Sequence, residues 1–351
     1  MTAVAVPSTR RRTPRWIHDA GTDAAIAFSW VPFAIAAFLA SGRGDATQVL
    51  MSATLLFSFT HQPLTLALVY GDAEQFAVRR RIFTWSPLVF AVAVFVTFNV
   101  SFVTLAIVGG LWNAVHTLFQ RYGIVQIYGR KVGESDGRLE RALLLSWLIG
   151  AAVFAAADTA TPDRIVEAGL AGHNRDALEV LTDLRPVALV LLPIAGVVAG
   201  WLTVEWVRRE LRAGADANPA KQLYVASTAA VFVVMLVSPI AGLIAYVGSH
   251  AFEYFVIVYT NLRSRYQLQP DDPAIVGRAV RSPIGRPGFL VLYLGSLVAV
   301  VMVLQRLESP TAYVLVFFVL GGLHVFYDGF IWKLRRPAVA RSFDLPAGTT
   351  S

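Results

Sequence analysis

Long blocks of apolar residues, separated by short polar segments, run along most of the chain. A helix needs about 20 consecutive apolar residues to cross the hydrocarbon core of a bilayer. Blocks of roughly this length predict about ten spans, at residues 22–41, 48–70, 84–98, 101–128, 140–157, 186–207, 222–238, 239–262, 288–305 and 312–333. Prolines cost a helix little in its first turn, and they stand at or just before several of these starts, as Pro87, Pro186, Pro239, Pro287 and Pro310.

The remaining segments complete this outline. Residues 1–21 form a basic tail that we expect to be disordered, and residues 334–351 form a second tail after a single transmembrane domain over 22–333. The largest loop on one side of the membrane covers 158–185, where apolar positions permit a short interfacial helix. On the opposite side, the loop 263–287 carries several charges.

Two joints in this outline are less sharply marked. The span at 84–98 is short, and the break at 238/239 leaves almost no loop. Residues 222–246 can instead form one long helix followed by a shorter one. Either arrangement returns the chain to the same side by Arg263. Because the first apolar run is longer than the core of a typical signal peptide, we expect it to be a retained helix.

The composition agrees with a membrane protein. Of the residues, 56% are hydrophobic and 15% are charged, whereas a soluble domain has about 25% charged and 45–50% apolar residues. Such a chain needs lipid as its solvent, so we expect an all-α, polytopic transmembrane helix bundle. The absence of cysteine excludes disulfides and thiolate metal ligands.

Lys and Arg are distributed unequally between the two sides of the predicted spans. On one side only Arg43, Arg164, Arg175, Arg185 and Arg306 are found, whereas the opposite side receives most of the other basic residues, including the Arg79–Arg81 run, Arg130, Lys131, Lys333, Arg335 and Arg336. By the positive-inside rule, the N-terminus and the C-terminus are both cytoplasmic, in the plasma (inner) membrane of a bacterium. The net charge of +7 therefore reflects topology, and we expect no nucleic-acid partner.

Four histidines lie inside predicted spans, where ionisable side chains are costly and usually functional. His61, His116, His250 and His324 fall on spans that all run in the same direction. Each lies about nine to twelve residues from the inner end of its span, or roughly 14–18 Å deep at the rise of an α-helix. The four imidazoles therefore share one layer near the bilayer midplane, and they converge if their helices are neighbours.

Polar residues accompany these histidines on the same helix faces. Glu253 follows His250 at i+3 and Asp328 follows His324 at i+4, spacings that place each acid beside its histidine. Because metal-bound histidines usually donate their other N–H to a carboxylate or amide, these acids are candidate supporting residues. One of the carboxylates is alternatively a direct ligand. The further supporting candidates are Asn113, Gln120, Tyr254 and Tyr327.

Imidazole is a ligand for iron, zinc, copper and nickel. A site rich in histidine, within an apolar layer where oxygen dissolves readily, favours non-haem iron and an oxygenase or other oxidoreductase. The expected partners are membrane lipid and an apolar, lipid-like or isoprenoid small molecule. Zinc and haem fit this pattern less well. One histidine per helix at a single depth excludes two stacked haems, and a single haem leaves two histidines unused.

Two other classes remain open. A proton-coupled transporter also places histidines and carboxylates at the midplane. A protein without a metal can use membrane histidines to pair helices by hydrogen bonds.

The segments around the histidines resemble a broad group of bacterial multispanning proteins and, more distantly, the Brp/Blh family of β-carotene 15,15′-dioxygenases. The resemblance rests on His116-Thr-Leu-Phe-Gln-Arg-Tyr-Gly123, on His250-Ala-Phe-Glu-Tyr254 and on His324-Val-Phe-Tyr-Asp-Gly-Phe-Ile-Trp-Lys333. It implies an iron site held by histidines of several helices. The chain departs from that family at His61, which Gln62 and Pro63 follow in place of a His-Gly-x-x-Asp string. The likeness thus implies an intramembrane metal site without a particular substrate.

Overall fold

Every regular element that the computed structural model describes is a helix, which confirms the all-α bundle. The described residues are 15–170, 175–267, 271, 274–285, 287–288, 291, 293–294, 297–298, 302 and 310–345. The helices are α1 (Ala20–Ala27), α2 (Trp30–Ala40), α3 (Gly44–Tyr70), α4 (Ala73–Ala77), α5 (Arg80–Val100), α6 (Phe102–Lys131), α7 (Arg138–Ala157), α8 (Thr161–Glu167), α9 (Arg175–Ala213), α10 (Pro219–Val237), α11 (Pro239–Leu262), α12 (Ile275–Arg281), α14 (Pro310–Ile331) and α15 (Pro337–Ser342).

Within the described part of the chain, 8 helical segments are long and apolar enough to cross a membrane, and α3, which covers the span expected at 48–70, is not among them. The short span expected at 84–98 is a full-length helix, α5. At Ser238 the backbone is extended, and Ser238 caps α11 by accepting a hydrogen bond from the Ala241 amide. This break separates α10 from α11, so the alternative of one long helix over 222–246 is wrong. The span expected at 288–305 lies largely outside the described residues.

Two boundaries differ from the sequence prediction. The first span is divided into α1 and α2, and the carbonyl of Ala27 at the break accepts a hydrogen bond from Ser227 on α10. α9 begins at Arg175, well before the predicted 186, and Pro186 lies inside it. A proline removes a single backbone donor and need not end a helix whose neighbours support it. The loop predicted over 158–185 is therefore shorter, and it contains the short helix α8.

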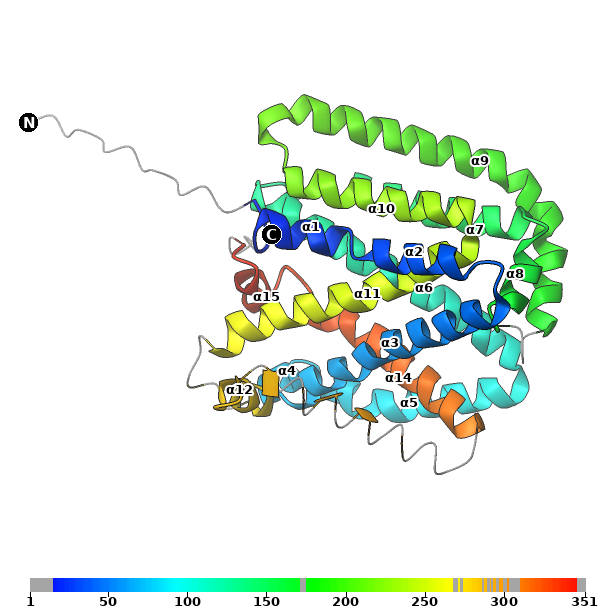
Figure 1. The fold of residues 1–351 in the computed structure, drawn as a ribbon. Helices are drawn as coiled ribbons and strands as arrows, with labels where there is room; N and C mark the ends of the chain where they lie inside the picture. The colour runs from blue at the N-terminus through cyan, green and yellow to red at the C-terminus, as the bar shows by residue number, and fades with distance from the viewer. Residues whose placement is uncertain are drawn as a thin grey trace, which may run out of the picture.

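The helices that carry the four histidines are neighbours. α3 and α6 both pack against α11 and against α14. In Figure 1, α11 crosses the middle of the bundle, whereas α9 lies along one outer edge. The most apolar stretch of α11 is 72% buried and that of α9 only 11%. α11 is thus the central helix, and α9 presents most of its surface outward.

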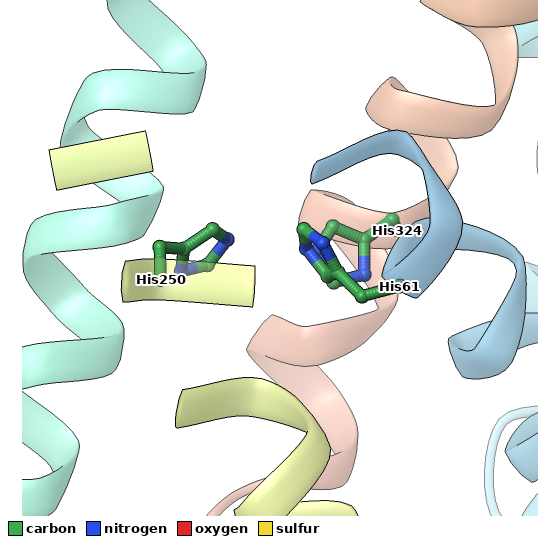
Figure 2. A group of neighbouring side chains, drawn as sticks. All are labelled: His61, His250 and His324. Atoms are coloured by element: carbon green, nitrogen blue, oxygen red, sulfur yellow. The ribbon is translucent and has the colours of Figure 1, made fainter. Parts of the chain in front are cut away.

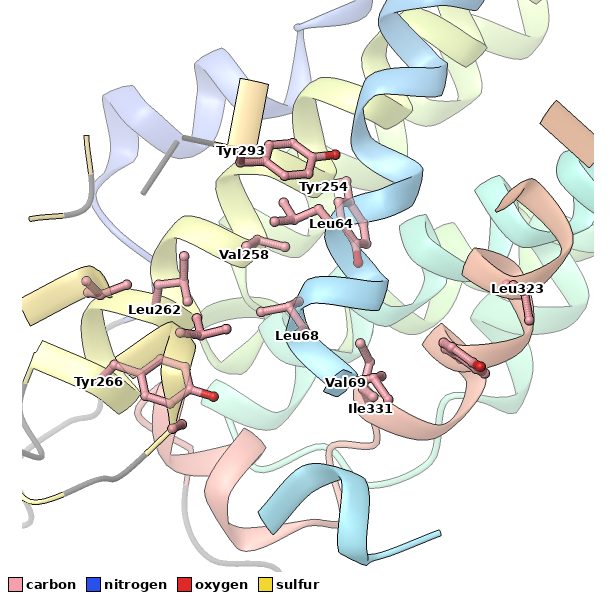
Figure 3. Packing of buried hydrophobic residues seen from close by; sticks show 14 of the residues in the cluster. Leu64, Leu68, Val69, Tyr254, Val258, Leu262, Tyr266, Tyr293, Leu323 and Ile331 are labelled. Carbon is pink, nitrogen blue, oxygen red and sulfur yellow. The ribbon is translucent and has the colours of Figure 1, made fainter. Parts of the chain in front are cut away.

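A hydrophobic cluster packs beside the histidines. Its fully buried members include Leu64 and Val69 of α3, Phe83 of α5 and Tyr254 of α11. Figure 3 shows Leu64, Leu68 and Tyr254 meeting between α3 and α11. This packing fixes the spacing of the helices around the site.

The two ends of the described chain meet at one end of the bundle. Arg15 donates a hydrogen bond to the carbonyl of Ala215 at 2.7 Å, and Lys131 donates one to the carbonyl of Phe343 at 2.9 Å. Ile17 packs against the cluster that contains Phe343. Figure 1 shows α1 and α15 at this end. We call it the basic end, because it carries Arg130, Lys131, Lys333, Arg335 and Arg336.

The Lys and Arg count predicts that the basic end faces the cytoplasm. A topology reporter fused after Lys333 should therefore report that this position lies in the cytoplasm. A topology reporter inserted at Asn174, between α8 and α9, should report that this position lies outside the cytoplasm. If both reporters place their positions on the same side of the membrane, the predicted topology is wrong.

Candidate metal centre

Four helices bring their histidines to one place inside the bundle. His61 lies on α3, His116 on α6, His250 on α11 and His324 on α14. All four side chains are buried, and the most exposed of them, His116, retains 9% of its surface. The structure thus brings together the residues that share one predicted depth.

His324 lies at the centre of the cluster. Its Nε2 atom is 3.1 Å from Nε2 of His61 and 3.0 Å from Nε2 of His116. The ring of His250 lies with its centroid 4.7 Å from that of His61 and 5.1 Å from that of His116. Figure 2 shows His61 and His324 side by side, with His250 facing them from α11. If Nε2 of His324 carries a hydrogen, it can donate a hydrogen bond to only one of the two neighbouring Nε2 atoms. A cation can instead accept the lone pairs of the Nε2 atoms of His61, His116 and His324 together.

Asp328 adds a carboxylate beside these rings. Its Oδ2 atom lies 3.7 Å from Nε2 of His116 and 3.8 Å from Nε2 of His324. Its Oδ1 atom accepts three hydrogen bonds of 3.1–3.2 Å, from Thr65, Tyr254 and Trp332. These bonds orient the carboxylate and leave Oδ2 directed at the histidines.

Thr65 supports two members of the site at once. Its hydroxyl lies 2.7 Å from Nδ1 of His324 and 2.5 Å from the hydroxyl of Tyr254. If Nε2 of His324 binds a metal, its Nδ1–H can donate to Thr65, which is the usual way in which a ligand ring is held. Sequence analysis did not identify Thr65. The available signal was its position four residues after His61, on the same helix face.

Two sets of side chains place their ligand atoms within 4.8 Å of one another, and both sets include His324. One set consists of His61, His250 and His324, and the other consists of His116, His324 and Asp328. The second set has two histidines and one carboxylate, a ligand combination typical of non-haem iron(II) oxygenases. An all-imidazole set also suits zinc and copper.

His250 has unsatisfied polar atoms. Its side chain is fully buried, and neither ring nitrogen has a hydrogen-bond partner among the described residues. A buried polar group without a partner costs about 1–3 kcal/mol. A metal ion bound to one nitrogen would remove part of this cost, so the orphaned ring fits a metal site.

Glu253 has partners other than the histidines. It forms an ion pair with Arg121 at 2.8 Å, with both side chains fully buried. It also accepts a hydrogen bond from Tyr224 at 2.8 Å. A buried carboxylate needs a cation, and for this reason Glu253 belongs to a separate network. Gln120 lies between the two sites, because its amide donates to the backbone carbonyl of His250 at 3.0 Å.

Two further predicted supporting residues lie away from the histidines. Asn113 is half-buried on α6 and makes no hydrogen bond to the cluster in the described part of the chain. The hydroxyl of Tyr327 lies 2.7 Å from that of Tyr70 and 2.8 Å from that of Ser86. Tyr327 therefore ties α14 to α3 and α5 within the apolar core.

Arg121 is a residue that the sequence analysis missed. Besides Glu253, it donates hydrogen bonds to Thr228 at 3.1 Å and to Ser249 at 2.7 Å. The signal was present, since an arginine inside the predicted span 101–128 is costly unless it is paired. Arg121 joins α6 to α10 and α11, and thereby fixes the helices that carry His116 and His250.

These positions give the two carboxylates different expected roles. Asp328→Asn should lower metal content strongly, because the Oδ2 atom facing the histidines loses its charge. Glu253→Gln should leave most of the metal bound, because Glu253 faces Arg121. The measurement is metal content per folded protein, with retained helical circular dichroism as the folding control. If Glu253→Gln loses more metal than Asp328→Asn, this assignment is wrong.

The fold and the site define a polytopic helix bundle with a buried cluster of histidines and one carboxylate. Comparisons of the chain with protein-family models, with curated proteins and with solved structures found no match. The likeness to the Brp/Blh family therefore stays a prediction from the sequence, and the case for function is built on geometry.

Proposed function

We propose that this chain is an intramembrane metalloenzyme that holds one non-haem iron ion and oxidises an apolar substrate from the bilayer. The observation that carries the proposal is the position of Nε2 of His324, which lies 3.1 Å from Nε2 of His61 and 3.0 Å from Nε2 of His116. The Oδ2 atom of Asp328 beside them supplies an anionic ligand. Neutral imidazoles with one carboxylate suit a divalent transition metal.

Iron bound there would supply the capacity to activate oxygen. The chain's own residues orient the ligands. Thr65 holds the ring of His324, and Tyr254 packs its ring 5.0 Å from that of His61.

A cavity gives an apolar molecule access to this site. It has a volume of about 780 Å³, and its lining includes His116 and Asp328. Trp112, Val115 and Phe119 also line it and are exposed on the face of α6. On a membrane-spanning helix such a face meets lipid, so this side of the cavity is an entry route from the bilayer.

The same geometry argues against a haem. The imidazoles of four helices pack against one another, with four pairs of ring centroids 4.6–5.1 Å apart. A porphyrin bound through two of these rings would overlap the other two. A proton relay or simple helix pairing requires no metal, and metal analysis therefore separates these classes from the proposal.

The test is metal analysis and absorption spectroscopy of detergent-purified protein, followed by oxygen uptake with isoprenoid and fatty lipids. We expect bound iron without a Soret band, and lipid-dependent oxygen uptake that the His324→Ala variant lacks. A Soret band would instead identify a haem protein. Purification without any metal, followed by failure to bind added Fe(II), would overturn the proposal.

A further inference from the structure

The cavity that reaches the histidines also reaches the basic end of the bundle. Its lining includes four cationic side chains, Arg130, Arg141, Lys333 and Arg335, and a single carboxylate, Asp328. Arg130 lies 14 residues after His116 on α6, and Lys333 lies nine residues after His324. At the rise of an α-helix the separation along α6 corresponds to about 21 Å. The cavity thus has a metal-binding end and a cationic end.

Among the described residues, the cations that line this end of the cavity form no ion pair with a carboxylate. Lys333 and Arg335 form no ion pair with any described residue, and Arg130 donates to a backbone carbonyl, that of Leu334, at 3.1 Å. Lys221, at the same end of the bundle, is different, because Glu134, Glu140 and Glu210 surround its ammonium group. Within the described part of the chain, buried Lys221 is therefore neutralised by carboxylates, whereas Lys333 and Arg335 form no ion pair.

The electrostatics of this end favour an anionic ligand. Burial, together with repulsion from Arg335, Arg79 and Arg336, lowers the pKa of Lys333. Burial and repulsion from Arg79, Arg335 and Arg265 likewise lower the pKa of Arg336. Mutually repelling cations are stabilised when an anion binds between them.

Between its two ends the cavity is mostly apolar, and Gln120, Tyr122 and Gln126 are its polar lining residues there. Phe119, Ile127, Ile257 and Val325, from three different helices, line it. Its volume of about 780 Å³ lies within the range of about 300–1,000 Å³ that is typical of small-molecule sites. An apolar passage with cations at one end matches a molecule with an apolar chain and one anionic group.

We propose that this cavity binds a lipid with an apolar chain and an anionic head group, the head group against Lys333 and Arg335 and the chain extending toward His116 and Asp328. The oxidation of the lipid's apolar chain at the histidines rests on the proposed function. Binding of the lipid itself requires no metal. The substrate class is a long-chain acid or lipid anion, placed with carbons far from the head group at the metal site.

The test is equilibrium binding of a radiolabelled long-chain fatty acid to the full chain, freed of metal, in nanodiscs of uncharged lipid. The methyl ester of the same acid is the uncharged comparison. Because hydrogen bonds to charged groups are strong, the acid should bind about ten-fold more tightly than the ester, or better. The double variant Lys333→Gln/Arg335→Gln should lose this preference. Arg138→Gln, at an exposed arginine of the same end, should keep it.

Unlabelled anionic phospholipid distinguishes the two sources of such a lipid. If the phospholipid displaces the acid, the natural ligand is assigned as a membrane lipid. If the acid stays bound, the natural ligand is assigned as a free acid. Either outcome supports binding through an anionic head group. Equal binding of acid and ester, or an unchanged preference in the double variant, would overturn the inference. Metal content is measured in parallel. A failure of lipid binding with full metal content leaves the proposed function intact, and a failure of metal binding with intact lipid binding affects only that function.

Discussion

His324→Ala is expected to remove nearly all bound metal, the largest loss of any single replacement. His324 belongs to both candidate ligand sets, and its Nε2 atom lies between those of His61 and His116. Removal of its imidazole therefore breaks both sets. Each of the other three histidines belongs to only one set. We expect His61→Ala, His116→Ala and His250→Ala to lower metal content as well, but less than His324→Ala, because each of them leaves the other ligand set intact.

A second variant separates the ligands from the residues that position them. Thr65→Val keeps the volume of Thr65 and removes the hydroxyl that holds Nδ1 of His324. Loss of such a partner should lower metal affinity about 10–100-fold without abolishing binding. His18→Gln serves as the control, because His18 contacts Asp23 and Thr260 and no member of the cluster. Unchanged metal content in any two of the four histidine variants would contradict the four-histidine site.

Arg121→Leu is expected to destabilise the protein severely. The replacement leaves the carboxylate of Glu253 buried without its cation, and breaking one side of a buried ion pair costs about 3–5 kcal/mol. It also removes hydrogen bonds to Thr228 and Ser249, which join α6 to α10 and α11. The measurement is thermal unfolding in detergent, followed by circular dichroism.

The double variant Arg121→Leu/Glu253→Leu tests the reason for this loss. Replacement of a whole buried ion pair by apolar residues is often nearly neutral, so the double variant should be more stable than either single variant. Additive losses would show that the two side chains act independently. Because the pair fixes the helices of His116 and His250, the single variants should also lose part of their metal.

The sequence predicted the helices better than their ends. Apolar length identified the helices α3, α5, α6 and α7, and Ser238 with Pro239 marked the break between α10 and α11. The division of the first span depends on Ser227, which lies far away in the sequence and satisfies the carbonyl of Ala27. The early start of α9 depends on its packing against α7. Neither contact has a local signature.

The candidate site was predictable only in part, because contacts between different helices again have no local signature in the sequence. The depth of a histidine can be counted from the end of its span, and this count placed all four in one layer. Spacing along one helix also placed Glu253 and Asp328 beside histidines, but it carries no information about the opposite helix. The structure places Arg121 opposite Glu253, and Thr65 opposite Asp328 and His324. The different roles of the two acids therefore follow from the neighbouring helices alone.

X-ray absorption spectroscopy at the edge of the metal that copurifies with the protein tests whether one metal ion is bound by imidazole nitrogens inside the bundle. We expect a first shell of nitrogen and oxygen ligands at about 2.0–2.2 Å, with the outer-shell scattering of several imidazole rings. This signal should be absent from the His324→Ala variant. A first shell without imidazole scattering, or a spectrum that His324→Ala leaves unchanged, would show that the histidines do not bind the metal.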